Sequence, residues 1–277
     1  MDLLRRLTYR SSTMALARSL HLTNLLRKLY YWWATSSDGI VHLKLGEADG
    51  RFYIRTPEEL RFFESYFLLE KAFLDALIST LRPGEVFYDV GTNVGKLAVP
   101  VAKVVGRKGQ VIAFEPEERF CRQLHENLDL NGLTNVRVFK VALGEENAVG
   151  QLQVGGGSCP SMVPHRSSAS GKPPGTFETV KVVQGDWLRE YENLPVPRAV
   201  KIDVEGFEYA VLRGLRRTLA EPQCELLCLE IHPKLLPPEA SPEAITAFVN
   251  SLGFTCLRTY PRVDEIHVVA TKGPNSH

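Results

Sequence analysis

The segment VFYDVGTNVG, residues 86–95, decides the fold. Its first half is a short run of apolar, β-branched and aromatic residues, which predicts a buried strand. Two glycines, Gly91 and Gly95, follow, and the sequence after them is apolar at helical spacing, with Pro100 expected to start or kink the helix. A strand, a glycine turn and a helix in this order form a cradle for an adenosine-containing ligand, because glycine lets backbone come close and a helix N-terminus offers free N–H groups.

Two acidic side chains accompany this cradle. Asp89 interrupts the strand near its end, and Glu115 closes the next apolar run, residues 111–114. A carboxylate at that spacing can accept hydrogen bonds from ribose hydroxyls. A hydride-transfer dehydrogenase would show the pattern G-x-G-x-x-G here, whereas this chain has D-x-G-x-N-x-G over residues 89–95.

Composition indicates an ordinary globular protein. The 277 residues suffice for one large α/β domain with additions, and a net charge of +1 gives no reason to expect nucleic acid as a partner. The five cysteines lack the spacing of a zinc site or a disulfide framework, so we expect buried free thiols and a cytoplasmic location. The sequence holds no apolar run of about eighteen residues, so it predicts no membrane span.

The first thirty-three residues form a basic, acid-poor amphipathic segment. Its arginines and one lysine outnumber its single acid, Asp2. Leucines follow helical spacing, and an aromatic cluster at residues 30–33 ends the segment. Three interpretations stay open: a targeting peptide, a helix lying on a membrane surface, or a helix that packs on the domain and covers its active site. The second interpretation would add peripheral membrane contact through residues 1–33.

The rest of the chain alternates strands and helices at the spacing of βαβ units. A hairpin signal at 41–54 and a helix capped by Thr56, with Pro57 in its first turn, come first. The next strands are expected at 86–90, 111–115, 136–141, 198–204 and 224–231, and the helices at 94–105, 117–131 and 207–219. A helix from Ser241 to about Leu252 leads to two closing strands, 254–259 and 265–270, which a short turn should make antiparallel.

This pattern predicts an α/β fold with a Rossmann-like, doubly wound, mostly parallel seven-stranded sheet and an antiparallel terminal strand. Residues 1–55 would form an N-terminal helical and hairpin extension, and residues 56–277 the main domain. Residues 155–176 interrupt that domain between two strand signals. They are rich in glycine, serine and proline and show no periodicity, so they form either a functional lid or a disordered surface loop.

Four motifs occur in order along the chain. They are the D-x-G-x-N-x-G turn, FEP at 114–116, NVRVFKVALG at 135–144 and KIDVEGFE at 201–208. Together they resemble the FkbM family of class I methyltransferases over about residues 56–270. The resemblance implies S-adenosyl-L-methionine as the cofactor. It also implies methyl transfer to a hydroxyl oxygen of a sugar, a glycan or glycolipid, or a secondary metabolite.

The same resemblance assigns cofactor roles residue by residue. The backbone of the turn from Gly91 to Gly95 would wrap the methionine moiety, with Asp89 near its ammonium group. Asn93 within that turn is either a ligand or a turn former. Glu115 would hold the ribose hydroxyls, and Ala142 and Leu143 would flank the adenine.

Carboxylates and one imidazole are expected at the mouth of this site. Asp203 and Glu205 follow the fourth strand, Glu230 and His232 end the next one, and ligands bind at the carboxyl ends of parallel strands. Methylation of an alcohol benefits from a base that removes its proton, and His232 fits that role because its ordinary pKa lies near neutrality. Asp203 would position the hydroxyl or support the histidine, and Glu205 is the third candidate catalytic residue. The other histidines, His267 among them, show no comparable neighbours in the sequence.

Several alternatives stay open. A divalent metal at Asp203, Glu230 and His232 is chemically feasible, but a hydrogen-bonded base system explains the same residues, and no metal is expected. An N-methyltransferase acting on another small molecule or a protein would carry Asn or Asp, two prolines and an aromatic residue where this chain has DVEG, residues 203–206. A non-catalytic membrane-surface module that retains the cofactor fold is motivated by the basic N-terminus and opposed by the intact glycine turn.

Overall fold

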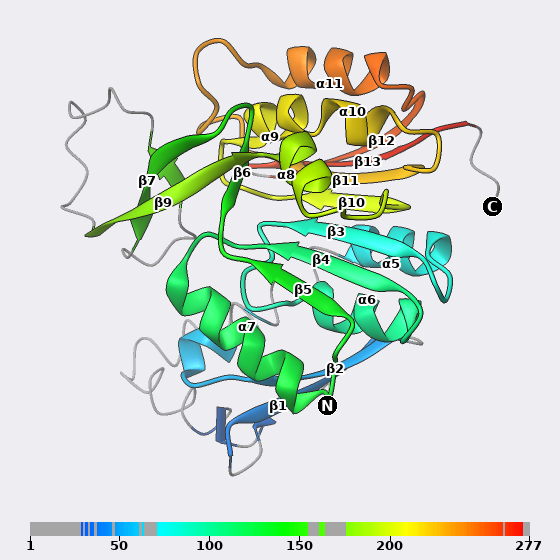
Figure 1. Cartoon of the computed structure of the whole chain (residues 1–277). Coiled ribbons are helices and arrows are strands. Elements are labelled where there is room, and N and C mark those ends of the chain that lie inside the picture. Colours follow the sequence, from blue (N-terminus) through cyan, green and yellow to red (C-terminus); the bar gives the residue numbers. More distant parts are fainter. Residues whose placement is uncertain are drawn as a thin grey trace. The chain divides into compact units, whose positions relative to one another are not determined.

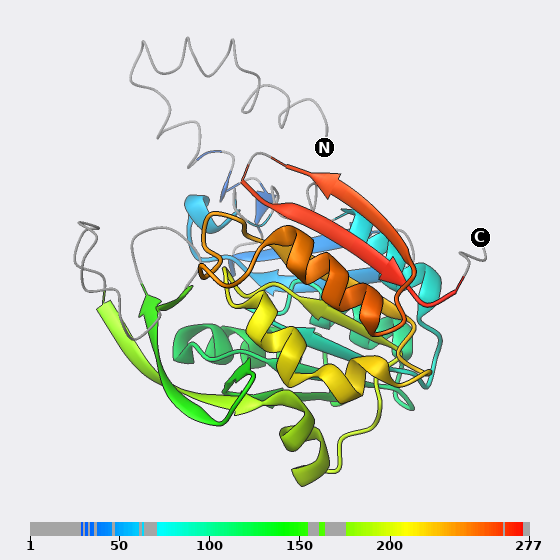
Figure 2. The same ribbon diagram turned by 90° about the horizontal axis from the view of Figure 1, so that it is seen from above.

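The computed structural model describes residues 29, 31–32, 34–35, 38–45, 48–60, 63, 71–154, 161–163, 176–262 and 264–273 (Figures 1 and 2). The chain divides into two compact units, Met1–Lys71 and Ala72–His277. The division expected from the sequence, an extension over 1–55 and a main domain over 56–277, stays a prediction.

The first unit contains the predicted hairpin. Strand β1 (Ile40–Leu45) pairs antiparallel with β2 (Ala48–Tyr53). The helix that follows begins as expected, because the Thr56 hydroxyl accepts the N–H of Glu59 at 3.1 Å and the Glu59 carboxylate accepts the N–H of Arg55 at 2.8 Å. The basic N-terminal segment lies almost entirely outside the described residues.

The second unit is built on a seven-stranded sheet with the order β12-β13-β11-β10-β3-β4-β5. The inner strands pair in parallel, and β13 pairs antiparallel with both β11 and β12, which confirms the predicted fold. The strands are β3 (Val86–Val90), β4 (Gln110–Phe114), β5 (Val136–Phe139), β10 (Ala199–Ile202), β11 (Leu226–Ile231), β12 (Cys256–Pro261) and β13 (Ile266–Thr271).

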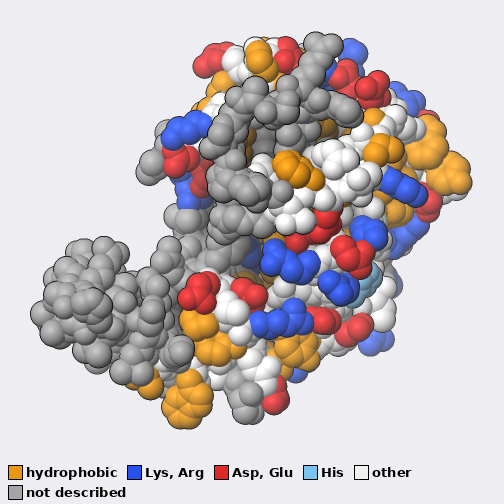
Figure 3. Space-filling view, turned by 90° about the vertical axis from the view of Figure 1, so that its left-hand side faces the viewer, with side chains coloured by type: hydrophobic (Ala, Val, Ile, Leu, Met, Phe, Trp, Pro, Cys, Tyr) orange, Lys and Arg blue, Asp and Glu red, His pale blue; other side chains and the backbone are white. Residues whose placement is uncertain are grey.

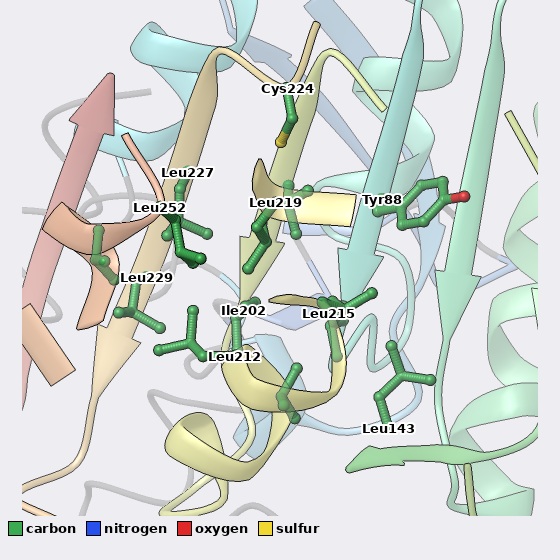
Figure 4. Close-up of a cluster of buried hydrophobic side chains, with 14 of the residues drawn as sticks. Tyr88, Leu143, Ile202, Leu212, Leu215, Leu219, Cys224, Leu227, Leu229 and Leu252 are labelled. Carbon is green, nitrogen blue, oxygen red and sulfur yellow. The ribbon is translucent and has the colours of Figure 1, made fainter. Parts of the chain in front are cut away.

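One face of this sheet carries the main hydrophobic core. Tyr88 and Ile202 belong to this core, together with side chains of α9 (Glu208–Gly214), α10 (Arg216–Ala220) and α11 (Pro242–Ser251). Leucines within or next to these helices, Leu212, Leu215, Leu219 and Leu252, fill much of the space (Figure 4). Side chains alternate along a strand, so Asp89 and Lys201, each one residue from a core position, project to the opposite face. There α6 (Ala98–Val105) packs on β3 and β4, and Phe73 of α5 (Lys71–Thr80) stacks on His267 of β13.

The helix expected at 207–219 is two helices, α9 and α10, so that prediction was wrong in its continuity. Leu215 between them has φ −100° and ψ 15°, which is not helical. Gly214 ends α9 where its Cα comes close to another part of the backbone: a Cβ there would stand 1.8 Å from the carbonyl oxygen of Gly144. Glycine is also a weak helix former, so the break falls at this position.

A second sheet was not predicted. The chain leaves the main sheet after Phe139, and β6 (Ala142–Gly144), β7 (Ala148–Val154), β8 (Ser161–Val163) and β9 (Thr176–Gln184) form a four-stranded sheet in the order β6-β9-β7-β8. The candidate lid, 155–176, contributes β8, which pairs antiparallel with β7. Residues 155–160 and 164–175 lie outside the described residues.

The thiols agree with the sequence prediction where they are described. Cys121, Cys224 and Cys228 are buried and Cys256 is half-buried, and none of these four is in a disulfide. Among the helices that the structure describes, none combines the length and apolar character needed to cross a lipid bilayer.

Asp186 ties α8 (Gly185–Tyr191) to the first turn of α10. Its side chain is 3% exposed. It accepts the N–H groups of Arg217 and Thr218 at 2.7 and 2.8 Å and the Thr218 hydroxyl at 2.6 Å. The carboxylate therefore satisfies backbone donors that α10 itself leaves unpaired.

We expect Asp186→Ala to lower the free energy of unfolding by about 3 kcal/mol, because it leaves buried donors without acceptors. Urea denaturation measures the change. Glu190→Ala is the control, since its ion pair with Arg217 is exposed and should be worth less than about 1 kcal/mol. Equal losses in the two variants would contradict this account of the α8–α10 junction.

Candidate active site

Acidic side chains gather where four neighbouring parallel strands end. Asp89 lies in β3, Glu115 directly follows β4, and Asp203 directly follows β10. Glu230 lies near the end of β11, and His232 comes just after that strand. These strands are adjacent and parallel, so the residues share one edge of the sheet, as the sequence predicted.

Asp89 is almost fully buried, at 1% exposed. Neither carboxylate oxygen accepts a hydrogen bond of normal geometry from the described residues. Burial raises the pKa of Asp89, and the ammonium of Lys201, 3.6 Å from Oδ1, lowers it in part. In its ionised form, an acid so enclosed would act on a ligand through its charge and would favour a cation nearby.

The glycine turn packs against the chain itself. Gly91 has φ +78°, and a Cβ at this position would stand 1.8 Å from the carbonyl oxygen of Asp203. Its N–H donates to the carbonyl of Phe114 at 3.0 Å. The sequence indicated that glycine here leaves room for a ligand, but the closest group is the backbone that follows β10.

Asn93 and Glu115 are brought together by this turn. The Asn93 N–H donates to Oε2 of Glu115 at 2.8 Å, and the Glu117 N–H donates to Oε1 at 2.9 Å. Asn93 has φ +55°, and its Oδ1 accepts the N–H of Val94, so it acts as a turn former. Burial raises the pKa of Glu115 to about 7, although the two N–H bonds oppose this rise.

His232 lies in a cluster of carboxylates. Its Nδ1 is 2.7 Å from Oε1 of the fully buried Glu208, and its Nε2 is 3.3 Å from Glu230 and 3.5 Å from Glu205. Burial lowers the pKa of His232, but its hydrogen bonds to Glu208 and Glu230 and the charges of Asp203 and Glu205 outweigh burial and raise that pKa to about 11. His232 is therefore an imidazolium at neutral pH.

Two of these acids remain open to an incoming molecule. The side chains of Asp203 and Glu205 are 18% and 24% exposed, whereas those of Glu208 and Glu230 are 0% and 7% exposed. Atoms of Asp203, Glu205 and His232 lie within 4.8 Å of one another, which is close enough for a shared cation. The contacts of His232 with its carboxylates account for the same residues without a metal, and the expected absence of a metal stays a prediction.

His267 has polar neighbours that the sequence did not predict, so that expectation was wrong. Antiparallel pairing of β13 with β11 places it opposite Glu230, and its Nε2 lies 3.2 Å from Oε2 of that residue. Arg262 donates to the same nitrogen at 3.0 Å. Only the register of the two strands reveals this contact.

Ala142 and Leu143 belong to the four-stranded sheet and not to the main sheet whose edge carries the acids. Both lie in β6, and the Leu143 side chain packs in the main hydrophobic core (Figure 4). The adenine-binding role of the two residues stays a prediction.

Figure 3 looks onto the side of the molecule that is at the left of Figure 1. On the described part of that face, acidic and basic side chains are interspersed. Mixed charge produces no uniform field across this face that would attract a polyanion.

The sequence pattern of the Methyltransferase FkbM domain matches residues 89–256, more than half of the chain. The chain belongs to the FkbM methyltransferase family. It is an S-adenosylmethionine-dependent methyltransferase. The matched region begins at Asp89 and includes every acid of the edge described above.

Two kinds of relatives accompany the family match. The hexuronic acid methyltransferase AglP of Haloferax volcanii is 27% identical over 217 residues, which are 77% of this chain and 84% of that protein. Among solved structures, a methyltransferase FkbM from Methylobacillus flagellatus has 16% identity and a TM-score of 0.45, covering 90% of this chain and 60% of that one. An rRNA methylase from Streptococcus thermophilus has 15% identity and a TM-score of 0.46, covering 73% and 94%. The assignment rests on the family match.

The charges at the edge fit the cofactor. The carboxyl groups of Asp89, Glu115 and Asp203 face the single ammonium of Lys201 within this group of four residues. The net charge of these four side chains is negative or zero, depending on whether Asp89 and Glu115 are protonated. S-adenosylmethionine carries a sulfonium and an ammonium against one carboxylate, so its positive charge complements the edge.

We expect Gly91→Ala to destabilise the protein by about 3 kcal/mol or more, because the added Cβ meets a backbone oxygen that cannot move freely. Gly84→Ala is the matched control: its φ is also positive, at +96°, but a Cβ there meets nothing within 4 Å. The control should lose only about 1–2 kcal/mol from its backbone conformation. Urea denaturation compares the two variants, and equal losses would show that the contact with Asp203 is not what requires glycine.

Proposed function

We propose that this protein transfers the methyl group of S-adenosylmethionine to a hydroxyl oxygen of a sugar, free or within a glycan or glycolipid. The observation that carries the proposal is the pair of partly open acids, Asp203 and Glu205, at the strand edge that also holds Asp89 and Glu115. The acceptor class is supported by the relative that is named for methylation of hexuronic acid.

The methyl donor is proposed to bind along the first half of the edge. Glu115 would accept bonds from the ribose hydroxyls, since each carboxylate oxygen retains a second lone pair beside the N–H that it already accepts. The turn at Gly91, Asn93 and Gly95 would border the methionine moiety, and Asp89 would favour its ammonium by charge. Ala142 and Leu143 would flank the adenine. When bound, the cofactor supplies an electrophilic methyl group on its sulfonium.

The proton of the acceptor hydroxyl is proposed to pass to Asp203 or Glu205. The sequence favoured His232 as the base because of its ordinary pKa, and that reason fails in the folded chain, where the raised pKa keeps the ring protonated. An imidazolium has no lone pair to accept a proton. It can hold the neighbouring carboxylates ionised, so that one of them takes the hydroxyl proton as the oxygen–methyl bond forms. Correct alignment of the hydroxyl would supply most of the remaining rate gain.

Two other readings have less support. N-methylation of another small molecule or a protein lacks the sequence pattern expected after β10, where this chain has DVEG at 203–206. A non-catalytic membrane-surface module gives no reason for the partly open acids beside a methyl-donor turn. Peripheral membrane contact through residues 1–33 stays a prediction, which flotation with anionic vesicles tests.

The proposed reaction is tested with methyl-labelled S-adenosylmethionine and a panel of hexuronic acids, neutral hexoses and amino sugars. We expect label in at least one hexuronic acid or hexose, with the methyl group on oxygen in the NMR spectrum of the product. Label on the nitrogen of an amino sugar alone, or on no sugar of the panel, would contradict the proposal.

The affinity for S-adenosylmethionine should rise with pH. Because the pKa of Glu115 is about 7, its ionised form, the better acceptor for ribose hydroxyls, predominates only above that pH. Between pH 6 and pH 8 the dissociation constant should therefore fall by roughly tenfold, as measured by titration calorimetry. Glu115→Gln should bind weakly and lose this dependence, whereas Glu146→Gln, an exposed control, should retain it. A pH-independent affinity in the wild-type protein would exclude Glu115 as the ribose ligand.

With saturating cofactor and acceptor, kcat should not rise around pH 6.5. A neutral-imidazole base would produce such a rise, but His232 stays protonated through this range because its pKa is about 11. His232→Gln should lower kcat by about 10²–10³, because the nearby carboxylates lose their cation. Exposed His125→Gln serves as the control. A wild-type profile with an inflection near pH 6.5 that disappears in His232→Gln would restore the histidine as base.

A further inference from the structure

Lys201 is a buried lysine in the middle of the site. It lies in β10 and is 2% exposed. Its neighbours Val200 and Ile202 belong to the main hydrophobic core, so Lys201 projects to the opposite face. On that face it is in register with Asp89 of β3.

The ammonium of Lys201 has partners on both sides of the site. Nζ donates to the carbonyl oxygen of Gly91 at 2.9 Å, on the side of the methyl donor. It lies 3.3 Å from Oδ2 of Asp203, on the side of the acceptor, and 3.6 Å from Oδ1 of Asp89. The ammonium therefore donates a hydrogen bond to the glycine turn and forms ion pairs with the two carboxylates.

Burial makes this arrangement rigid. Removing an ammonium from water carries a large desolvation penalty, and only close and well-oriented oxygens offset it. The lysine therefore constrains its partners as much as they constrain it. Lys201 Nζ contacts both the Gly91 carbonyl and the Asp203 carboxylate. This adds to the close backbone approach between Gly91 and the Asp203 carbonyl oxygen.

We propose that Lys201 is a positioning residue, which fixes the Asp203 carboxylate against the glycine turn and so sets the distance between the acceptor hydroxyl and the methyl donor. The inference rests on the proposed function, because it takes Asp203 as an acid that receives the acceptor hydroxyl. Lys201 itself touches neither substrate in this role.

The geometry predicts an effect on turnover rather than on acceptor binding. Loss of the ammonium frees the Asp203 carboxylate to move, and a displacement of about 1 Å in such a group costs about 10² in rate. Lys201→Met should therefore lower kcat and kcat/KM for the acceptor by a similar factor of about 10², with acceptor KM changed by less than about threefold. Lys108→Met, an exposed lysine, is the matched control and should leave both constants unchanged.

A double-mutant cycle with Asp203→Asn separates positioning from general structural support. If Lys201 acts through Asp203, Lys201→Met should cost about 10² in kcat in the wild-type background and less than about threefold in the Asp203→Asn background. A structural role would cost the same in both backgrounds, and that additive result would overturn the inference.

A second variant covers the case in which Lys201→Met does not fold. Lys201→Gln keeps an N–H donor for the Gly91 carbonyl but removes the charge that holds Asp203, so it should show the same cycle with Asp203→Asn. Urea denaturation of each variant confirms that it is folded. Additivity in an enzyme that methylates sugars would overturn the Lys201 inference alone, whereas a wild-type protein inactive on every sugar would overturn the proposed function and this inference with it.

Discussion

The close approach of Gly91 to the carbonyl oxygen of Asp203 is the constraint on which the site depends. Strands β3 and β10 are adjacent and parallel, so the turn after one meets the turn after the other at the same edge of the sheet. No side chain fits between them, because even a Cβ at position 91 would stand 1.8 Å from the Asp203 oxygen. The neighbouring strands add their own residues to this edge: β4 is followed by Glu115, and β11 by His232. The proposed donor side and acceptor side of the site thus meet at one backbone contact.

Burial divides the acids of this edge into two kinds. Asp89, Glu208 and Glu230 are nearly inaccessible, and their charges act through a medium in which charge interactions are strong. Asp203 and Glu205 remain partly open, with side chains 18% and 24% exposed, and are the acids proposed to meet the acceptor. The high pKa of His232 follows from this division, since the buried carboxylates around it favour the imidazolium. The proposed catalysis by a carboxylate beside an imidazolium follows from this packing and differs from the neutral-histidine mechanism that the residue type alone favours.

Much of the fold was readable from the sequence because its signals are local. A short apolar run before the glycine turn predicts β3, and recurring apolar runs at βαβ spacing predict the rest of the sheet, including the antiparallel pair at its end. The four-stranded second sheet was missed, although the sequence shows strand signals on both sides of 155–176, because the pairing of β9 with both β6 and β7 joins segments that are distant in sequence. The break at Leu215 was missed because it depends on the approach of Gly214 to Gly144, which are distant in sequence.

The candidate site was predictable in position but not in chemistry. Strand ends located Asp89, Glu115, Asp203 and His232 correctly at one edge. The role of His267 depends on the register between β11 and β13, and the protonation of His232 depends on carboxylates contributed by separate segments. Strand register and the protonation of a buried histidine both depend on segments distant in sequence, so residue types and spacing could not predict them.

The decisive measurement is a crystal structure of the protein with S-adenosylhomocysteine and a hexuronic acid. We expect the ribose hydroxyls within hydrogen-bond distance of Glu115, and a sugar hydroxyl that donates to Asp203 or Glu205 while facing the sulfur. A nucleoside bound away from Glu115, or a sugar hydroxyl that faces the sulfur without contact to either acid, would contradict it.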